Sequence, residues 1–124
     1  MTNAKGVYDL EERTAIFGED IILLCRSIHQ DAITRPLIGQ IIRSGTSIGA
    51  NYMEANGASS RKDFRNKIFI CKKESQETKH WLRMLVKATP EKEEEIGKLR
   101  REAHELTLIF QKIAKSSSEH SSQD

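Results

Sequence analysis

Residues 34–57, TRPLIGQIIRSGTSIGANYMEANG, contain the pattern that decides the fold. Thr34 and Pro36 are typical of a helix start, because proline lacks an N–H group that the first turn leaves unused. Apolar or small residues then recur in steps of three and four, which is the spacing of one helix face. They are Ile38, Ile41, Gly45, Ile48, Tyr52 and Ala55. The small residues at 44–50 predict a close neighbouring backbone, and Gly57 is expected to end the helix in a left-handed conformation.

The same period occurs in three other segments, which predicts four helices. Asp9 and Glu12 have the spacing of a capping box at the start of the first helix, and Ser60 and Asp63 have it at the start of the third. The fourth helix is expected to follow the Thr-Pro pair at 89–90. Because all three connections are short, consecutive helices are expected to be antiparallel neighbours. The predicted fold class is all-α, an antiparallel up-down-up-down four-helix bundle.

Length and composition limit the remaining possibilities. One domain is predicted over residues 1–115, and the polar stretch at 116–124, SSSEHSSQD, is expected to be disordered. No run approaches the roughly 18 apolar residues that a membrane span needs, and the N-terminal residues lack a signal-peptide core. Cys25 and Cys71 lie in apolar helical stretches and are expected to be reduced and packed, with a disulfide as the alternative. These features predict a cytoplasmic protein without membrane contact.

Charge is distributed unevenly along the chain. Residues 1–33 carry three Lys/Arg and six Asp/Glu, a net charge of −3, whereas residues 59–90 carry nine and three, a net charge of +6. The acidic first helix would neutralise this basic run internally, or the run would contact a polyanion. No aromatic or Asn/Gln readers alternate with the cations, so phosphate contact without base reading is expected. The residues predicted to bind nucleic acid are Arg61, Lys62, Arg65, Lys72, Lys73 and Lys79.

Motifs for metal binding or catalysis are incomplete. Glu77 and His80 form a Glu-x-x-His unit, as in di-iron bundles, but the second copy and the further glutamates of such a site are missing. Cys25 and His29 have the spacing of two zinc ligands, and no paired motif offers the others. A surface histidine and a core thiol are the simpler interpretations. The sequence therefore predicts no catalytic residue, no metal site, no cofactor and no enzymatic activity.

Several polar or amphipathic residues lie beside the apolar faces of the second and third helices. Buried amides and carboxylates need hydrogen-bond partners, which Arg43 or Arg83 would supply. A structural hydrogen-bond network between the two helices is expected, with ligand binding as the alternative. The residues predicted for this network are Asn51, Glu54, Glu77 and Trp81.

Apolar residues also occur off the four core-facing stripes. A monomer would expose them, and exposed apolar patches mark interfaces. Self-association is therefore expected. The residues predicted for the oligomer interface are Ile16, Leu23, Leu108 and Ile109.

Three segments carry a resemblance to a known family: RSGTSIGANYMEANGA at 43–58, SRKDFRNKI at 60–68 and KKESQETKHWLRML at 72–85. They are similar to the small bacterial four-helix-bundle proteins encoded in intervening sequences of 23S ribosomal RNA genes. The resemblance spans nearly the whole helical region.

The most specific matches are the Ser-Ile-x-x-Asn-x-x-Glu run at 47–54 and the Glu-x-x-x-Trp-Leu run at 77–82. Met53 departs from the family pattern, which has a small or aliphatic residue there. Ala55 followed by Asn56 departs as well, because many members place glycine at this point.

The resemblance implies a homopentamer around a central channel. It also implies a relationship to the accessory protein of diversity-generating retroelements, a basic pentamer that contacts nucleic acid and a reverse transcriptase. The leading hypothesis is a non-enzymatic, homo-oligomeric bundle, pentameric by this resemblance, that associates with RNA or other nucleic acid through a basic face. The alternative is a structural protein-interaction module with no nucleic-acid role, and a metal-dependent bundle oxidase is a third hypothesis.

Overall fold

The computed structural model describes residues 9–121, with side chains as far as residue 117. This range contains four α-helices and one short 3₁₀ helix, and no strand. The prediction of an all-helical chain with four helices is confirmed. The elements are α1 (Leu10–Arg26), α2 (Thr34–Asn56), α3 (Arg61–Ala88), η1 (Pro90–Lys92) and α4 (Glu93–Ser121).

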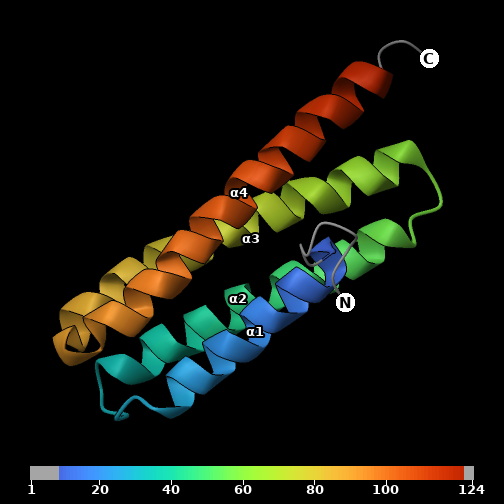
Figure 1. Cartoon of the computed structure of the whole chain (residues 1–124). Coiled ribbons are helices and arrows are strands. Elements are labelled where there is room, and N and C mark those ends of the chain that lie inside the picture. The colour runs from blue at the N-terminus through green and yellow to red at the C-terminus, as the bar shows by residue number, and fades with distance from the viewer. Residues whose placement is uncertain (1–8, 122–124) are drawn as a thin grey trace.

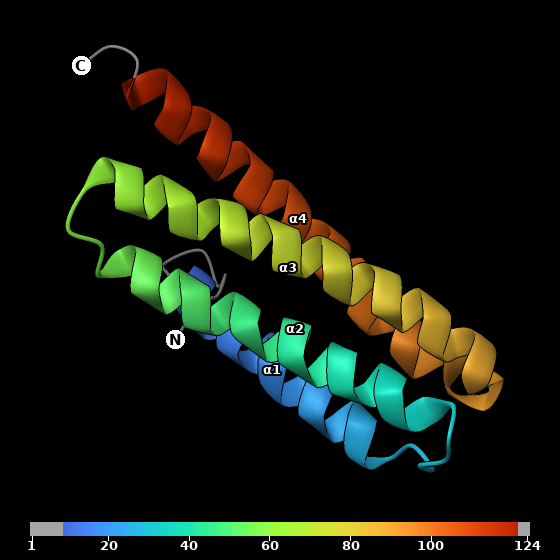
Figure 2. The same ribbon diagram turned by 180° about the vertical axis from the view of Figure 1, so that it is seen from behind.

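The helices lie side by side as a bundle in which α3 has two extensive neighbours (Figures 1 and 2). It packs along α2 on one side and along α4 on the other. Helix α1 packs on α2 and touches α4 lightly, and within the described residues it makes no contact with α3. The acidic first helix therefore does not pack against the basic third helix inside one chain. Of the two alternatives for the basic run, pairing with the first helix within one chain is the less favoured, because α1 and α3 are diagonal in the bundle.

The helix starts follow the predicted capping residues. Asp9 Oδ1 accepts a hydrogen bond from the Glu12 N–H at 2.8 Å, and Ser60 Oγ accepts one from the Asp63 N–H at 3.0 Å. Both groups satisfy backbone donors that the first helical turn leaves without partners. Both predicted caps are confirmed. Helix α2 begins at Thr34, as predicted.

The helix ends differ from expectation at three places. Gly57 has φ −97° and ψ 10°, so the predicted left-handed cap is wrong, and its N–H instead donates to the Glu54 carbonyl at 3.2 Å. After Thr89, the 3₁₀ turn η1 precedes α4. Helix α4 continues through Ser121, so residues 116–121 are helical where disorder was expected. Extending an existing helix adds one hydrogen bond per residue, which offsets the modest helix propensity of serine. Residues 122–124 lie outside the described range.

The core runs along the inward faces of all four helices. Its largest fully buried apolar side chains are Phe17, Ile21, Ile41, Ile48, Ile68, Leu82, Leu85, Ile96, Leu106 and Phe110. At the α1–α2 contact the backbones come close, as the small residues of α2 predicted. A Cβ atom at Gly45 would lie 2.9 Å from Cγ1 of Ile21, and one at Gly49 would lie 3.3 Å from the Thr14 carbonyl oxygen.

Candidate functional site

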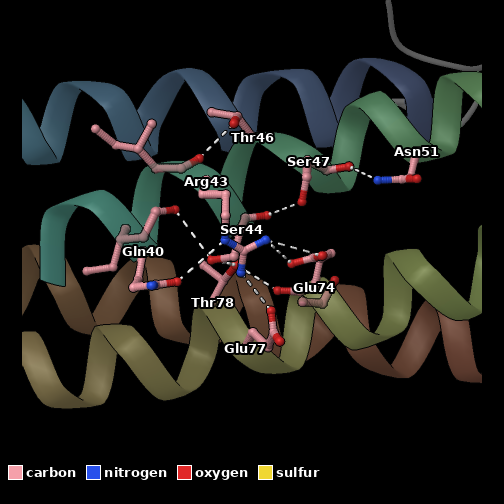
Figure 3. Close-up of polar contacts among 12 residues, drawn as sticks. Gln40, Arg43, Ser44, Thr46, Ser47, Asn51, Glu74, Glu77 and Thr78 are labelled. Atoms are coloured by element: carbon pink, nitrogen blue, oxygen red, sulfur yellow. Dashed lines mark hydrogen bonds and ion pairs between the residues drawn. The ribbon is translucent and has the colours of Figure 1, made fainter. Parts of the chain in front are cut away.

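A cluster of charged side chains joins α2 to α3. Arg43 of α2 donates through Nη1 to both carboxylate oxygens of Glu74, at 3.3 and 3.4 Å. Its Nη2 donates to Oε2 of Glu77 at 2.9 Å (Figure 3). Glu74 is 7% exposed, whereas half of the Arg43 side chain is exposed. The Arg43 guanidinium of α2 therefore hydrogen-bonds two carboxylates of α3, of which Glu74 is buried and Glu77 is partly exposed.

The two carboxylates respond to this environment in opposite directions. Burial raises the pKa of Glu74, because the charged form loses its hydration, and the hydrogen bond to Glu77 raises it further. The hydrogen bond from Arg43 lowers the pKa of Glu77. A raised and a lowered pKa side by side are found in catalytic sites and in structural ion-pair networks alike. Here the charged groups all face one another across a helix contact, which favours structure.

Buried hydroxyl groups lie next to this charged cluster. Thr78 Oγ1 is hydrogen-bonded to Ser44 Oγ at 2.8 Å across the α2–α3 contact, and it lies 2.7 Å from the Glu74 carbonyl oxygen (Figure 3). Both hydroxyl groups are inaccessible to solvent. Because each has a partner, the pair adds no unsatisfied polar group to the core.

The predicted polar network is only partly assembled. Glu77 joins the cluster around Arg43, and the exposed Glu54 accepts a separate hydrogen bond from Lys67 Nζ at 2.6 Å. Asn51 instead donates to the Ser47 carbonyl within α2, at 2.8 Å. Trp81 is half-buried against the core, with its ring edge-to-face on His80. The structure thus links Glu54 and Glu77 to the neighbouring helix but leaves Asn51 and Trp81 outside those contacts.

The sequence places Glu74 among the polar residues beside the core-facing stripe of the third helix, but the predicted network did not include it, although it is the most buried carboxylate of the cluster. A signal was present, because Glu74 precedes Glu77 by three residues and residues at that spacing share a helix face.

Most of the predicted nucleic-acid residues gather on one side of α3. At about 3.6 residues per turn, Arg61, Arg65, Lys72 and Lys79 fall within a sector of about 40°. Lys79 Nζ lies 3.0 Å from Nδ1 of His104 on α4, so this sector faces α4. The other two predicted residues, Lys62 and Lys73, are exposed and lie roughly 100° further round the helix.

Helix α4 adds positive charge along the same edge. At the start of α3, Arg61 and Phe64 line a groove with Lys112, Ile113, Ser116 and Ser117 of α4. We call Arg61, Arg65, Lys72, Lys79 and Lys112 the cationic strip. Sequence reasoning missed the contribution of α4, because a single sequence does not show which helix lies beside the basic run.

The four residues predicted for the oligomer interface do not share one face. Leu23 and Leu108 are 60% and 51% exposed, and Ile16 and Ile109 are half-buried. Ile16 lines a groove between α1 and α4. Leu108 follows His104 by one turn and therefore lies beside the cationic strip, whereas Ile109 points about 100° away from it.

Metal and thiol chemistry find little support in the described part of the chain. Among residues 9–117, whose side chains are described, no cluster of three or more His, Cys, Asp or Glu side chains is placed to hold a metal ion. Cys25 and Cys71 are buried and not linked to each other. Burial raises the pKa of the Cys25 thiol to about 11 and that of Cys71 to about 12, which suppresses the reactive thiolate. None of the helices described here combines the length and the apolarity that crossing a membrane requires.

The fold and these contacts define a small helical bundle with a charged α2–α3 cluster and a cationic edge. Residues 9–120 match the family described as 23S rRNA-intervening sequence protein, and the chain belongs to that family. The chain is also similar to a crystal structure of a protein with unknown function from the S23 ribosomal protein family of Bacteroides thetaiotaomicron. The two share 32% sequence identity with a TM-score of 0.77, over 86% of this chain and 99% of that one. No curated protein matches the chain in sequence.

Proposed function

We propose that the protein is a non-enzymatic, homo-oligomeric bundle that associates with RNA or other nucleic acid through the cationic strip. It acts in the cytoplasm, as a pentamer of antiparallel up-down-up-down bundles. The pentamer and the ligand class come from the family resemblance, which implies a relationship to the accessory protein of diversity-generating retroelements, a basic pentamer; this relationship is part of the proposal.

The observation that carries the proposal is the way α3 divides its charges. Two of its three acidic residues, Glu74 and Glu77, face α2, where Arg43 neutralises them. Four of its cations face α4, which contributes Lys112 to the same edge. Within residues 9–117, no carboxylate forms an ion pair with Lys72 or Lys112. A row of lysines and arginines in which Lys72 and Lys112 have no neutralising carboxylate attracts a phosphate backbone.

Self-association follows from the exposed apolar side chains. Leu23, Ile33 and Met53 are each at least 59% exposed, and further apolar side chains are exposed on α3 and α4. Covering such residues with a second copy removes apolar surface from water. A ring would repeat the cationic strip in every subunit, so modest contacts add up through multivalency.

Binding to a structured RNA hairpin at a series of salt concentrations tests the proposal. The logarithm of the association constant should fall linearly with the logarithm of the salt concentration, because bound phosphates release counterions. Charge reversal at Lys72 and Lys73 should flatten this dependence. Native mass spectrometry should show the same pentamer for the wild type and for the charge-reversed variant. Loss of the oligomer then does not explain the weaker salt dependence.

Three results would overturn the proposal or a part of it. Wild-type protein that binds neither structured RNA nor DNA at low salt would favour the protein-interaction module. Binding that ignores salt would exclude the cationic strip as the contact surface. Purely monomeric wild-type protein in native mass spectrometry would remove the oligomer from the proposal.

A further inference from the structure

A second pocket between α3 and α4 has a lining dominated by nitrogen donors. It is lined by Lys79, Gly97, Arg100, Arg101, His104 and Glu105. The carboxylate of Glu105 lies 3.8 Å from Nη2 of Arg13 on α1, so a cation outside the pocket lies near it. With Lys79, Arg100 and Arg101 against this carboxylate, the pocket carries net positive charge.

Arg100 presents an unusual donor. Its Nε is buried, and no hydrogen-bond acceptor reaches it within the part of the chain whose side chains are described. A buried donor without an acceptor is costly, by about 1–3 kcal/mol, and such groups in native proteins call for an explanation. Arg101 likewise forms no ion pair among these residues. Carboxylates are near, because Glu105 lines the same pocket and Glu93 and Glu94 line a neighbouring one with both arginines, but none of them forms an ion pair with either guanidinium among these residues.

The contact between Lys79 and His104 fixes the role of the histidine. Lys79 Nζ lies 3.0 Å from His104 Nδ1, and an ammonium group donates hydrogen bonds but does not accept them. Nδ1 must therefore be the acceptor, which assigns the proton of the neutral ring to Nε2. The histidine then offers an N–H donor. Ammonium, guanidinium and imidazole N–H groups together form a donor set for an anion with several acceptor oxygens.

We propose that this pocket binds a phosphate group, as inorganic phosphate or as a phosphomonoester. A phosphate dianion offers more acceptor oxygens and more charge than a carboxylate, and arginine guanidinium groups bind it through paired hydrogen bonds. The pocket shares Lys79 with the cationic strip, but its other donors come from α4. It is therefore a discrete anion site that does not depend on RNA binding along the strip.

The side-chain Nε–H signal of Arg100 in the full-length protein reports on this pocket directly by NMR. Titration with inorganic phosphate should shift the signal and saturate it, and chloride at matched ionic strength should not. Arg101→Gln and Lys79→Gln should each weaken phosphate affinity by about tenfold or more, since a hydrogen bond to a charged group contributes about 1.5–3 kcal/mol.

Two matched variants separate this site from net charge and from the strip. Lys98→Gln removes one charge from α4, but Lys98 lines the groove toward α1. Lys72→Gln removes one charge from the strip. Both variants should bind phosphate with the affinity of the wild type. This result is expected even if the cationic strip does not bind RNA.

RNA oligomers with a 5′-phosphate or a 5′-hydroxyl distinguish the sources of the ligand. If inorganic phosphate and the 5′-phosphorylated oligomer shift the signal but the 5′-hydroxyl oligomer does not, the result supports the site and assigns it to the end of a nucleic acid. A shift with inorganic phosphate and neither oligomer supports a free anion as the ligand. No saturable shift with phosphate, an equal shift with chloride, or equal weakening by Lys98→Gln and Arg101→Gln would overturn the proposal.

Discussion

The two sides of α3 hold their charges in different ways. Toward α2, Glu74 and Glu77 meet Arg43, and Lys67 meets Glu54 at 2.6 Å. Toward α4, Lys79 lies 3.0 Å from His104, at a pocket whose lining has three cationic side chains and one carboxylate. Charges of opposite sign attract each other across the α2–α3 contact. At the α3–α4 contact, the excess of positive charges is repulsive in the folded protein.

This difference separates two uses of charge on one helix. Paired charges stabilise the contact between α2 and α3 and do not need a ligand. Cations without carboxylate partners add little or nothing to stability, and their repulsion is relieved when an anion binds. Substitutions on the two sides should therefore affect different measurements.

The largest loss of stability is expected on the α2 side. Arg43→Ala would leave the buried Glu74 carboxylate without its partner and should lower the free energy of unfolding by about 1–2 kcal/mol. The estimate lies in the lower part of the range because Arg43 is half exposed. Chemical denaturation followed by circular dichroism measures this change.

The matched control on the other side is Arg101→Ala. It also removes an arginine from a helix surface, but this arginine has no ion-pair partner among the described residues. In phosphate-free buffer its effect should stay within about 0.5 kcal/mol of the wild type. If the two variants lose equal unfolding free energy, the arginine side chains stabilise the protein by packing on the helix surface rather than by ion pairing.

A smaller effect concerns the dependence of stability on pH. The raised pKa of Glu74 means that its contribution is fully present below the ordinary glutamate pKa and is lost as pH rises through the folded-state value. The lowered pKa of Glu77 means the reverse: its contribution is present above the ordinary value and is lost as pH falls through the folded-state value.

Glu74→Gln and Glu77→Gln should therefore show opposite trends. Between about pH 3 and about pH 7, Glu74→Gln should gain stability relative to the wild type as pH rises. Glu77→Gln should lose stability relative to the wild type over the same interval. Unfolding free energies across this range measure both trends, and parallel trends in the two variants would contradict the assigned environments.

Much of the fold could be predicted because its signals are local. The capping pairs at Asp9 and Ser60 and the apolar period of each helix depend only on residues a few positions apart. Gly57 shows where local rules fail. Glycine without a side chain suits a left-handed cap, but Gly57 has φ −97° where the chain turns toward α3. Tertiary geometry decides among conformations that glycine adopts equally well.

The candidate site was less predictable because it depends on which helices become neighbours. The acidic α1 looked like a partner for the basic α3, yet α3 lies between α2 and α4. Lys112 and Arg100 acquire their significance only from this placement. Leu108 was expected at an oligomer interface on grounds of exposure alone, and the structure places it one turn from His104, beside the cationic strip.

The most direct test of the division of charge on α3 compares Lys67→Gln with Lys72→Gln in RNA binding across salt concentrations. Each removes one positive charge from the same helix, but Lys67 is paired with Glu54 toward α2 and Lys72 belongs to the cationic strip. Lys72→Gln should reduce the steepness of the salt dependence by about 1 for each contacting subunit, because one phosphate contact is lost. Lys67→Gln should leave the steepness unchanged. Equal reductions in the two variants would contradict the account, because net charge alone would then govern binding.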